Sequence, residues 1–331
     1  MHPGSTAVPV RLHHVLPRWR GMAAAGDVTL LERGIRIGIV GSRRPREDTR
    51  ELASRIAREA GRAGCTIVSG LAIGIDAAAH EAALSVGAPT IAVLPSGLGE
   101  IYPSSHRALA ARIAAQPACA RTRQLSACHD GAAPGLVVSE YGAGDVGAHR
   151  HQFQERNRII AALSDYVVVA QAHLASGSMG TARHALELGV PLGVIPSGID
   201  DPGYAGSIAL IRDGADAVVD GMSLYRRLEL HGVLHPGFAA AATHGARIDP
   251  ERRGAWIGGT EPVQTAMLVD HPLASLLDVP RTPEELAGLT GLELRDVRRM
   301  LVELEDEAAA AIASDGTWTI VDHVRPAGSV V

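Results

Sequence analysis

The stretch "IGIVGSRRPREDTRELASRIAREAG", from Ile37 to Gly61, decides the fold of this chain. It runs from an apolar, β-branched segment through Gly41-Ser42 and a basic corner into an amphipathic helical pattern. A glycine corner between a buried strand and a helix brings exposed N–H groups and the positive end of the helix dipole to one point. The stretch therefore predicts a strand–helix unit whose corner binds an anion.

The same alternation repeats from Arg36 to about Asp220. Apolar runs predict strands at residues 36–40, 65–70, 89–97, 135–140, 165–172 and 191–198. Helical spacing of apolar residues predicts helices at 48–61, 74–87, 104–116, 153–164 and 177–189. Strands without polar alternation are buried on both faces, so the repeated units predict an α/β fold with a doubly wound parallel sheet.

Small or hydroxylated corners follow five of the predicted strands. In such a sheet, ligands bind beyond the carboxyl ends of the strands, so these corners are expected to converge on one anion-binding crevice. The competing interpretation is that the turns use Gly and Ser for backbone reasons alone. The corners are Gly41-Ser42, Ser69-Gly70, Ser96-Gly97, Ser139-Glu140 and Ser197-Gly198.

The composition excludes several classes of chemistry. All 31 basic residues are Arg, which excludes Schiff-base chemistry, pyridoxal phosphate anchoring and the Lys-containing phosphate loop. The formal net charge is -5, so a nucleic-acid site has to be a local basic patch. No long apolar run and no signal-like segment are present, and we expect a soluble, cytoplasmic protein.

The three cysteines are widely spaced, which fits a reducing compartment and no disulfide framework. Cys119 and Cys128 with His129 could suggest zinc, but their spacing matches no standard zinc motif. We therefore expect no metal and no cofactor.

The regions outside the repeated units differ in composition. We expect an N-terminal arm at 1–34, a core at 35–220 with an insertion at 121–135, a linker at 221–271 and a small winged-helix-like domain at 272–324. In the last region Thr282 caps a short helix that begins at Pro283, and a hairpin is expected around Asp315-Gly316. Its mixed charge leaves both DNA and protein open as partners.

The stretch "HRHQFQERNRIIAALSDYVVV", from His149 to Val169, concentrates positive charge and one aromatic ring at a helix entrance. Arginine neutralises phosphates while an aromatic ring stacks on a base, a combination that binds single-stranded nucleic acid. The alternative is structural: Phe153 fastens the helix start, and the arginines pair with Glu140, Glu155 or Asp165.

Seven segments, in this order and spacing, resemble the DNA-processing protein A (DprA, or Smf) family. They are "IGIVGSRRP", "CTIVSGLAIGIDAAAHEAAL", "TIAVLPSGLGEIYPSSHRAL", "VVSEY", "FQERNRIIAALSDYVVV", "SGSMGTARHALELG" and "GSIALIRDGADAVV". The resemblance implies a Rossmann-like core with a C-terminal winged helix that binds single-stranded DNA in a basic pocket. It also implies a homodimer that loads the RecA recombinase on incoming strands during natural transformation.

The resemblance also implies a set of binding residues. The family's glycine-serine-arginine corner, the basic residue ahead of an aromatic, the aromatic itself, the Arg-Asn-Arg triplet and the Ser-Gly-Ser corner fall on matching positions here. These positions are Gly41, Ser42, Arg43, Arg150, Phe153, Arg156, Asn157, Arg158, Ser176, Gly177 and Ser178. Arg43 and Arg150 would meet phosphates, Phe153 would stack on a base, and the N–H groups of the two corners would cradle a phosphate.

Some positions depart from the family pattern. Ile73 stands where the family has Arg, and Gln171 stands where an acidic residue is usual. Both change the charge expected of the pocket. The N-terminal helical domain common in the family is largely missing, since about 34 residues precede the core.

Two other functions stay open. A lysine-decarboxylase-like (LOG) phosphoribohydrolase shares this type of core, but the position of its Glu is His184 here, and His cannot supply the negative charge that glycosidic cleavage uses. A free-nucleotide sensor is the second alternative. Asp76 and His80 share one helical face, but capping and buried hydrogen bonding explain them without catalysis, so no catalytic residue is expected.

Overall fold

The computed structural model divides the chain into two compact units, Met1–Ala239 with Arg247–Ile257, and Ala240–Ala246 with Gly258–Val331. It describes residues 12, 15, 22–115, 135–142, 144, 147–196, 201–249, 256–257, 273, 276–277, 280–306, 310–312 and 317–320. The expected insertion at 121–135, the pair Cys119 and Cys128, and the corner Ser197-Gly198 lie almost wholly outside these residues.

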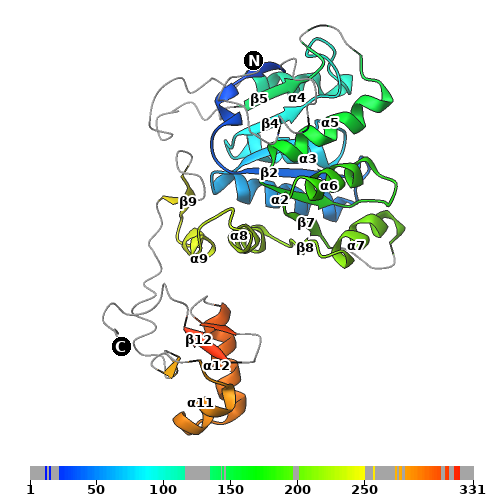
Figure 1. Ribbon diagram of the computed structural model, residues 1–331. Helices are drawn as coiled ribbons and strands as arrows, with labels where there is room; N and C mark the ends of the chain where they lie inside the picture. Colours follow the sequence, from blue (N-terminus) through cyan, green and yellow to red (C-terminus); the bar gives the residue numbers. More distant parts are fainter. Residues whose placement is uncertain are drawn as a thin grey trace. The chain divides into compact units, whose positions relative to one another are not determined.

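An eight-stranded sheet forms the centre of the first unit (Figure 1). Seven strands are parallel and one edge strand, β1, is antiparallel to its neighbour β5. The spatial order is β1-β5-β4-β3-β2-β6-β7-β8. The bounds are β1 Ala23–Gly26, β2 Arg36–Gly41, β3 Thr66–Ser69, β4 Thr90–Val93, β5 Gly135–Ser139, β6 Tyr166–Ala170, β7 Leu192–Ile195 and β8 Asp216–Ala217. The parallel sheet predicted from the apolar runs is confirmed for β2 to β7, whereas the antiparallel edge strand β1 and the short strand β8 are not among the predicted strands.

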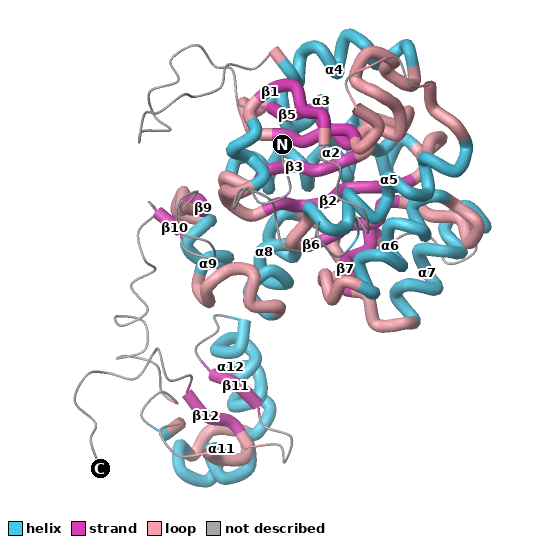
Figure 2. The backbone as a smooth tube through the Cα atoms, turned by 45° about the horizontal axis from the view of Figure 1, so that its top comes forward, coloured by secondary structure: helices cyan, strands magenta, loops and turns pink. Residues whose placement is uncertain are grey.

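Helices cover both faces of this sheet (Figures 1 and 2). The strand order runs outward in one direction from β2 to β5 and in the other from β6 to β8, so right-handed crossovers place the two sets of helices on opposite faces. Accordingly α2 packs on α3, and α5 packs on α6. The bounds are α2 Glu47–Arg62, α3 Ile75–Ser85, α4 Arg107–Ala114, α5 Arg150–Leu163, α6 Gly177–Glu187 and α7 Ala205–Arg212.

Burial follows from the continuous apolar strands. Ile37, Ile39, Val68 and Ile91 have no exposed surface, and every residue of β6 is fully buried. A strand buried on both faces contributes apolar area on each side of the sheet, which stabilises the two helical layers together. The centre of the sheet is thus a rigid support for the loops at its edges.

Two segments outside the predicted core belong to it. Residues 22–31, expected within an N-terminal arm, supply β1 and a 3₁₀ helix, η1 (Val28–Leu31), and Met22, Leu30 and Leu31 join the main apolar core. The expected linker begins with α8 (Gly221–Leu230), which packs on α2. β1 is only four residues long and is held by its pairing with β5, whereas α8 buries Leu224, Tyr225 and Leu228 at helical spacing.

The second unit has its own apolar core. It contains α11 (Pro283–Thr290), α12 (Leu294–Asp306) and an antiparallel pair, β11 (Ala310–Ile312) and β12 (Trp318–Ile320). Thr282 caps α11 in a capping box with Glu285, as its sequence predicts, and Gly291 ends the helix in a left-handed conformation. Helix, turn, helix and an antiparallel strand pair occur in the predicted order, and the turn predicted at Asp315-Gly316 lies outside the described residues.

Within the described parts of the chain, no helix is long and apolar enough to span a bilayer.

Candidate functional site

The middle of the sheet contains the point where the strand order changes direction. β2 lies between β3 and β6, and the chain leaves the carboxyl ends of β2 and β6 toward helices on opposite faces. Open α/β sheets bind ligands at such a switch point because the two diverging connections leave a crevice between them. A cavity of about 440 Å³ occupies this position, and we call it the switch-point crevice.

Nine of the eleven binding residues that the family resemblance implies line this crevice. They come from the loop after β2, the first half of α5 and the start of α6. The nine are Gly41, Ser42, Arg43, Phe153, Arg156, Asn157, Ser176, Gly177 and Ser178. Segments more than a hundred residues apart in the sequence therefore meet at one place.

Arg43 and Phe153 are the pair most suited to nucleic acid. The Arg43 guanidinium carbon lies over the Phe153 ring, 5.1 Å from its centroid, and the Arg43 side chain is exposed. Tyr102 meets Phe153 edge to face, with ring centroids 5.3 Å apart and an interplanar angle of 78°. A guanidinium next to aromatic rings offers a phosphate contact and a base-stacking surface within one side chain's reach.

The start of α6 supplies backbone donors. The first N–H groups of a helix have no partner within it, and the N-cap residue Ser176 makes no capping hydrogen bond. Its hydroxyl instead lies 2.8 Å from that of Ser178, and the Asn157 amide donates to the Gly177 carbonyl at 3.0 Å. Asn157 thus holds the helix start in place, and Ser176, Gly177 and Ser178 line the crevice.

Arg156 forms the floor of the crevice rather than an exposed contact. Its side chain is almost fully buried and donates to the carbonyl oxygens of Gly70 and Val93 at 2.5 and 2.6 Å. Burial lowers the pKa of Arg156 to about 10, although nearby Asp76 raises it, so the group is charged at neutral pH. Burial also raises the pKa of Asp76, and Arg156 opposes that shift. The guanidinium ties the ends of β3 and β4 to α5.

Arg150 and Arg158 do not line the crevice. Arg150 begins α5 and is exposed. Arg158 forms an ion pair with Glu140 at 2.7 Å, with about a fifth of its side chain exposed, which is the pairing that the structural alternative predicts. A helix turns by about 100° per residue, so Arg156 and Arg158 cannot face the same side. The main-chain N–H of Ser42 is also engaged, donating to the Ala170 carbonyl at 3.3 Å.

Three of the other predicted corners, Ser69-Gly70, Ser96-Gly97 and Ser139-Glu140, take part in hydrogen bonds to the main chain. The Ser69 hydroxyl donates to the Ile39 carbonyl at 2.6 Å, and the Ser139 hydroxyl donates to the Ser96 carbonyl at 2.6 Å. All three serines are fully buried, and none of them lines the crevice. The expectation that the corners line one crevice is thus wrong for these three, because their strands lie on one side of the switch point, although the Gly70 carbonyl accepts from Arg156 at the crevice floor.

Other lining residues were not identified as binding residues from the sequence. Arg44 follows Arg43 and is exposed, and His173 lies after the end of β6. Gln171 accepts a hydrogen bond from the Arg46 N–H at 2.8 Å and adopts a positive φ of 56°. Their positions in the sequence could have identified them, because residues that directly follow the two strands at a switch point line its crevice.

Of the residues considered for catalysis, Asp76 lines the crevice, whereas His80, His184 and Glu187 do not. His80 is fully buried, its Nδ1 lies 2.7 Å from the Thr90 hydroxyl, and burial lowers its pKa to about 3. His184 lies 3.1 Å from Glu187, and neither lines the crevice. Among the residues that line the crevice, Asp76 is the one carboxylate, and it lies buried beside Arg156. This arrangement lacks the accessible carboxylate that glycosidic cleavage uses.

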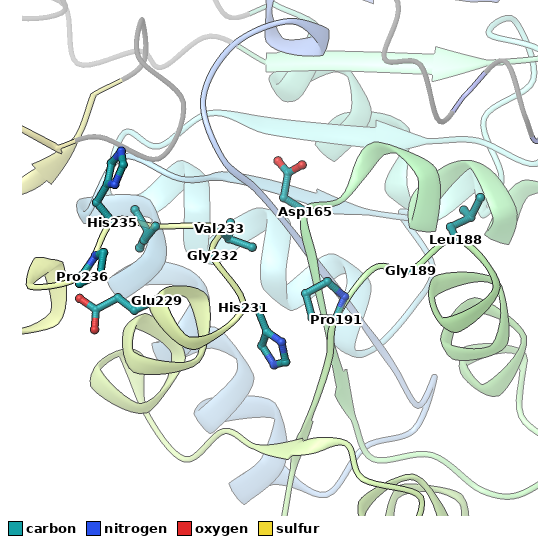
Figure 3. Close-up of a pocket in the computed structure, with 11 residues that line it drawn as sticks. Asp165, Leu188, Gly189, Pro191, Glu229, His231, Gly232, Val233, His235 and Pro236 are labelled. Carbon is teal, nitrogen blue, oxygen red and sulfur yellow. The ribbon is translucent and has the colours of Figure 1, made fainter. Parts of the chain in front are cut away.

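A larger cavity, of about 600 Å³, lies at the opposite edge of the sheet. Figure 3 shows the segment from Glu229 to Pro236 on one side of it and Leu188, Gly189 and Pro191 on the other. Asp165 and Pro191 precede β6 and β7, so this amino-edge cavity lies where the strands begin. Among its described lining residues are acidic and histidine side chains but no arginine. Its charge does not suit a phosphate.

Fold and crevice together define a Rossmann-like α/β protein with an arginine- and phenylalanine-lined crevice at its switch point. Residues 3–229 match the model of the DNA recombination-mediator protein A family, and the chain belongs to this family. The DNA processing protein DprA of Bacillus subtilis is 35% identical over 212 residues, which are 64% of this chain and 65% of that protein. Protein Smf of Synechocystis is 32% identical over 281 residues, which are 81% of this chain and 66% of that protein. The chain therefore spans just under two thirds of the length of these relatives.

Two solved structures of DNA processing protein A support the assignment of the chain to this family. The DNA processing protein A of Streptococcus pneumoniae is 33% identical, with a TM-score of 0.57 over 67% of this chain and 71% of that chain. The Helicobacter pylori protein, whose structure concerns a unique single-stranded DNA binding mode, is 31% identical, with a TM-score of 0.55 over 67% of this chain and 92% of that chain. The predicted resemblance is confirmed.

Proposed function

We propose that this chain binds single-stranded DNA in the switch-point crevice without cleaving it. The observation that carries the proposal is the Arg43 guanidinium 5.1 Å from the Phe153 ring centroid, beside the uncapped first turn of α6. Arg43 and Arg44 would neutralise phosphates, the α6 N–H groups would bind phosphate oxygens, and Phe153 would stack on a base. The single-stranded DNA binding mode described for the Helicobacter pylori relative supports this assignment.

The proposed mechanism explains why the strand would be held without sequence reading. Phosphate contacts and stacking are common to every nucleotide, whereas base identity is read by hydrogen bonds to base edges. Arg43, Arg44 and the α6 N–H groups suit the backbone, and the Phe153 ring suits any base. Arg156 and Asn157 would act as positioning residues, because their hydrogen bonds hold the floor and the α6 start.

The test is a titration of labelled oligothymidine of increasing length, followed by fluorescence anisotropy at several salt concentrations. The affinity should rise with oligonucleotide length and fall with salt concentration. A plot of the logarithm of the binding constant against the logarithm of the salt concentration should have a slope of about -0.7 for each phosphate neutralised. Arg43→Ala should flatten the slope by about one such contact, while Arg107→Ala, at the start of α4 and outside the crevice lining, should not. Salt-independent affinity would contradict the proposal.

The same samples separate the alternatives. Incubation with AMP should release no adenine if the protein is not an enzyme, whereas a phosphoribohydrolase would release the base. Binding of mononucleotides with no gain for longer strands would identify a nucleotide sensor instead. The lack of an exposed carboxylate among the crevice-lining residues favours strand binding over hydrolysis.

We propose further that the protein forms a homodimer and loads the RecA recombinase during natural transformation, as the family resemblance implies. Light scattering should then give twice the mass of the chain. Addition of the protein should also shorten the lag of RecA-dependent ATP hydrolysis on DNA covered by single-strand-binding protein. A monomeric mass would contradict the proposed homodimer, and an unchanged lag would contradict the proposed loading of RecA.

We also propose that the second unit is a winged helix. Arg281 forms a β-bridge with Trp318, which adds a third short segment to the β11–β12 hairpin, and α11 and α12 precede it. Arg298 and Arg299 pair with Glu284 and Asp296, so this helix pair presents mixed charge rather than a basic face. Protein binding is therefore favoured over DNA binding, and deletion of the unit should leave oligonucleotide affinity unchanged.

A further inference from the structure

A narrow groove adjoins the switch-point crevice on the side of α3. It shares Arg43, Ala72 and Phe153 with the crevice, and Ile73 and Tyr102 extend it. Its volume is about 30 Å³, too small to enclose a nucleic-acid base. A flat ligand would therefore lie across the mouth of the groove, against the side chains that form its rim.

The rim exposes apolar surface that the fold does not use. Ile73 is 52% exposed and Tyr102 is 45% exposed, although large apolar side chains are usually buried. The Tyr102 and Phe153 rings stand at 78° to each other, which makes an aromatic corner open toward the groove. Since both rings and Ile73 line one groove, their exposed surfaces form one continuous patch.

The position of Arg43 connects this patch to the crevice. Its guanidinium lies over Phe153, and Arg43 lines both the crevice and the groove. In a single strand, one phosphate joins each pair of neighbouring nucleotides. A phosphate bound by Arg43 would therefore have one base on the Phe153 side and the next base within reach of the groove rim.

We propose that Ile73 and Tyr102 form a binding position for a second, neighbouring base of the strand. This inference rests on the proposed function of the crevice and names the smallest ligand that fills the whole site, a dinucleotide with an internal phosphate. The bases of single-stranded DNA have apolar faces that aromatic and aliphatic side chains cover without reading sequence. The groove position thus selects for strand length rather than for base identity.

The experiment compares thymidine monophosphate, the dinucleotide pTpT and a labelled oligothymidine in the full chain. Tyr102→Ala and Ile73→Ala should each weaken pTpT and oligothymidine binding by about fivefold or more, the scale of losing one stacked base. Binding of the mononucleotide should change less than twofold. Tyr102→Phe keeps the ring and should bind like the unchanged protein.

Leu230→Ala is the matched control, because Leu230 is 68% exposed and lines neither the crevice nor the groove. Thermal unfolding of each variant shows whether the fold is retained. The inference is overturned if the two groove variants lose mononucleotide and pTpT binding equally, or if they lose neither while the fold is intact. Failure of the unchanged protein to bind any oligonucleotide would instead overturn the proposed function.

A charged variant gives a second, independent readout. Ile73→Arg places a guanidinium where the second base is proposed to lie, so it should weaken stacking but add a phosphate contact. Its oligothymidine affinity should depend more steeply on salt than that of the unchanged protein. An unchanged salt slope would place position 73 outside the path of the strand and overturn the inference.

Discussion

The amino-edge cavity and the switch-point crevice lie at opposite ends of the strands of the same sheet, and the crevice, although smaller, has the lining that suits a phosphate better. The amino-edge cavity holds about 600 Å³ and is lined by Asp165, Glu229 and histidines. The switch-point crevice holds about 440 Å³ and combines exposed arginines, an aromatic ring and the start of a helix. Charge and free backbone donors, rather than volume, decide which cavity can hold a phosphate.

A glutamate introduced into each cavity is the strongest test of this difference. Arg43→Glu replaces a phosphate contact by a like charge, and we expect a loss of several kcal/mol of binding free energy for oligothymidine. His235→Glu, in the amino-edge cavity, should change the affinity less than twofold. Fluorescence anisotropy at low salt measures both variants, and similar losses would contradict the assignment of the site.

A second test compares one buried polar group of the switch-point crevice with one of the amino-edge cavity. The free energy of unfolding is the quantity measured. Arg156→Met removes the donor to the Gly70 and Val93 carbonyls and should cost about 3 kcal/mol of stability, because both acceptors are left buried without a partner. Glu229 accepts from the Ala239 N–H at 2.8 Å, and Gln at this position can accept as well. Urea denaturation should therefore show that Glu229→Gln lowers the free energy of unfolding by less than about 1 kcal/mol. Equal losses would mean that Arg156 does not hold the floor of the crevice.

Removal of an aromatic ring should have an intermediate effect on binding. Phe153→Ala should cost about 1–3 kcal/mol of oligothymidine affinity if a base stacks on the ring. Phe153→Tyr keeps the stacking surface and should restore the affinity. Leu188→Ala, a truncation in the amino-edge cavity, serves as the matched control and should leave the affinity unchanged. An unchanged affinity for Phe153→Ala with an intact fold would limit Phe153 to a packing role.

The core beneath the crevice should respond to acid through His80. Burial lowers the pKa of His80 to about 3, so below about pH 6.5 the unfolded chain binds a proton that the folded chain does not. The stability that His80 contributes is thus present above about pH 6.5 and is lost as pH falls toward 3, by at most about 1.4 kcal/mol per pH unit. The raised pKa of Asp76 has the opposite sign and offsets part of this loss in its own titration range.

Unfolding titrations of the unchanged protein and of His80→Gln measure this effect. The variant should show a flatter dependence of stability on pH between about 6.5 and 4.5, because Gln does not titrate. Parallel curves for the two proteins would show that His80 does not govern the acid sensitivity.

Much of the fold and part of the site could be predicted from the sequence, because both depend on local chemistry. Continuous β-branched runs predict the strands, and the Gly41-Ser42 corner with Arg43 is recognisable from its residue types alone. The family resemblance places Arg43 and Phe153 in one binding pocket, and the two groups lie 5.1 Å apart. Capping residues predict the start of α11 in the same way.

The remaining features of the site depend on the side to which each side chain points, which the order of residues in the sequence does not contain. Arg156 and Arg158 lie two residues apart in one basic run, yet one forms the buried floor and the other pairs with Glu140. Ser69 and Ser139 follow apolar runs just as Ser42 does, but their hydroxyls donate to the main-chain carbonyls of Ile39 and Ser96 beside the switch point. The edge strand β1 is too short to give an apolar pattern and depends on its pairing with β5, whereas the apolar residues of α8 do recur at helical spacing, so this helix could have been predicted.

Gly41 lies where the crevice and the centre of the sheet coincide, opposite Ala170 in the β2–β6 pairing. A methyl group at this position would collide with the Ala170 carbonyl oxygen, a backbone atom that cannot move aside. In a genetic screen for lost DNA handling, alleles at codon 41 should therefore appear as low-abundance protein, whereas alleles at codon 43 should accumulate to normal amounts. The two nearby codons would report folding and binding separately.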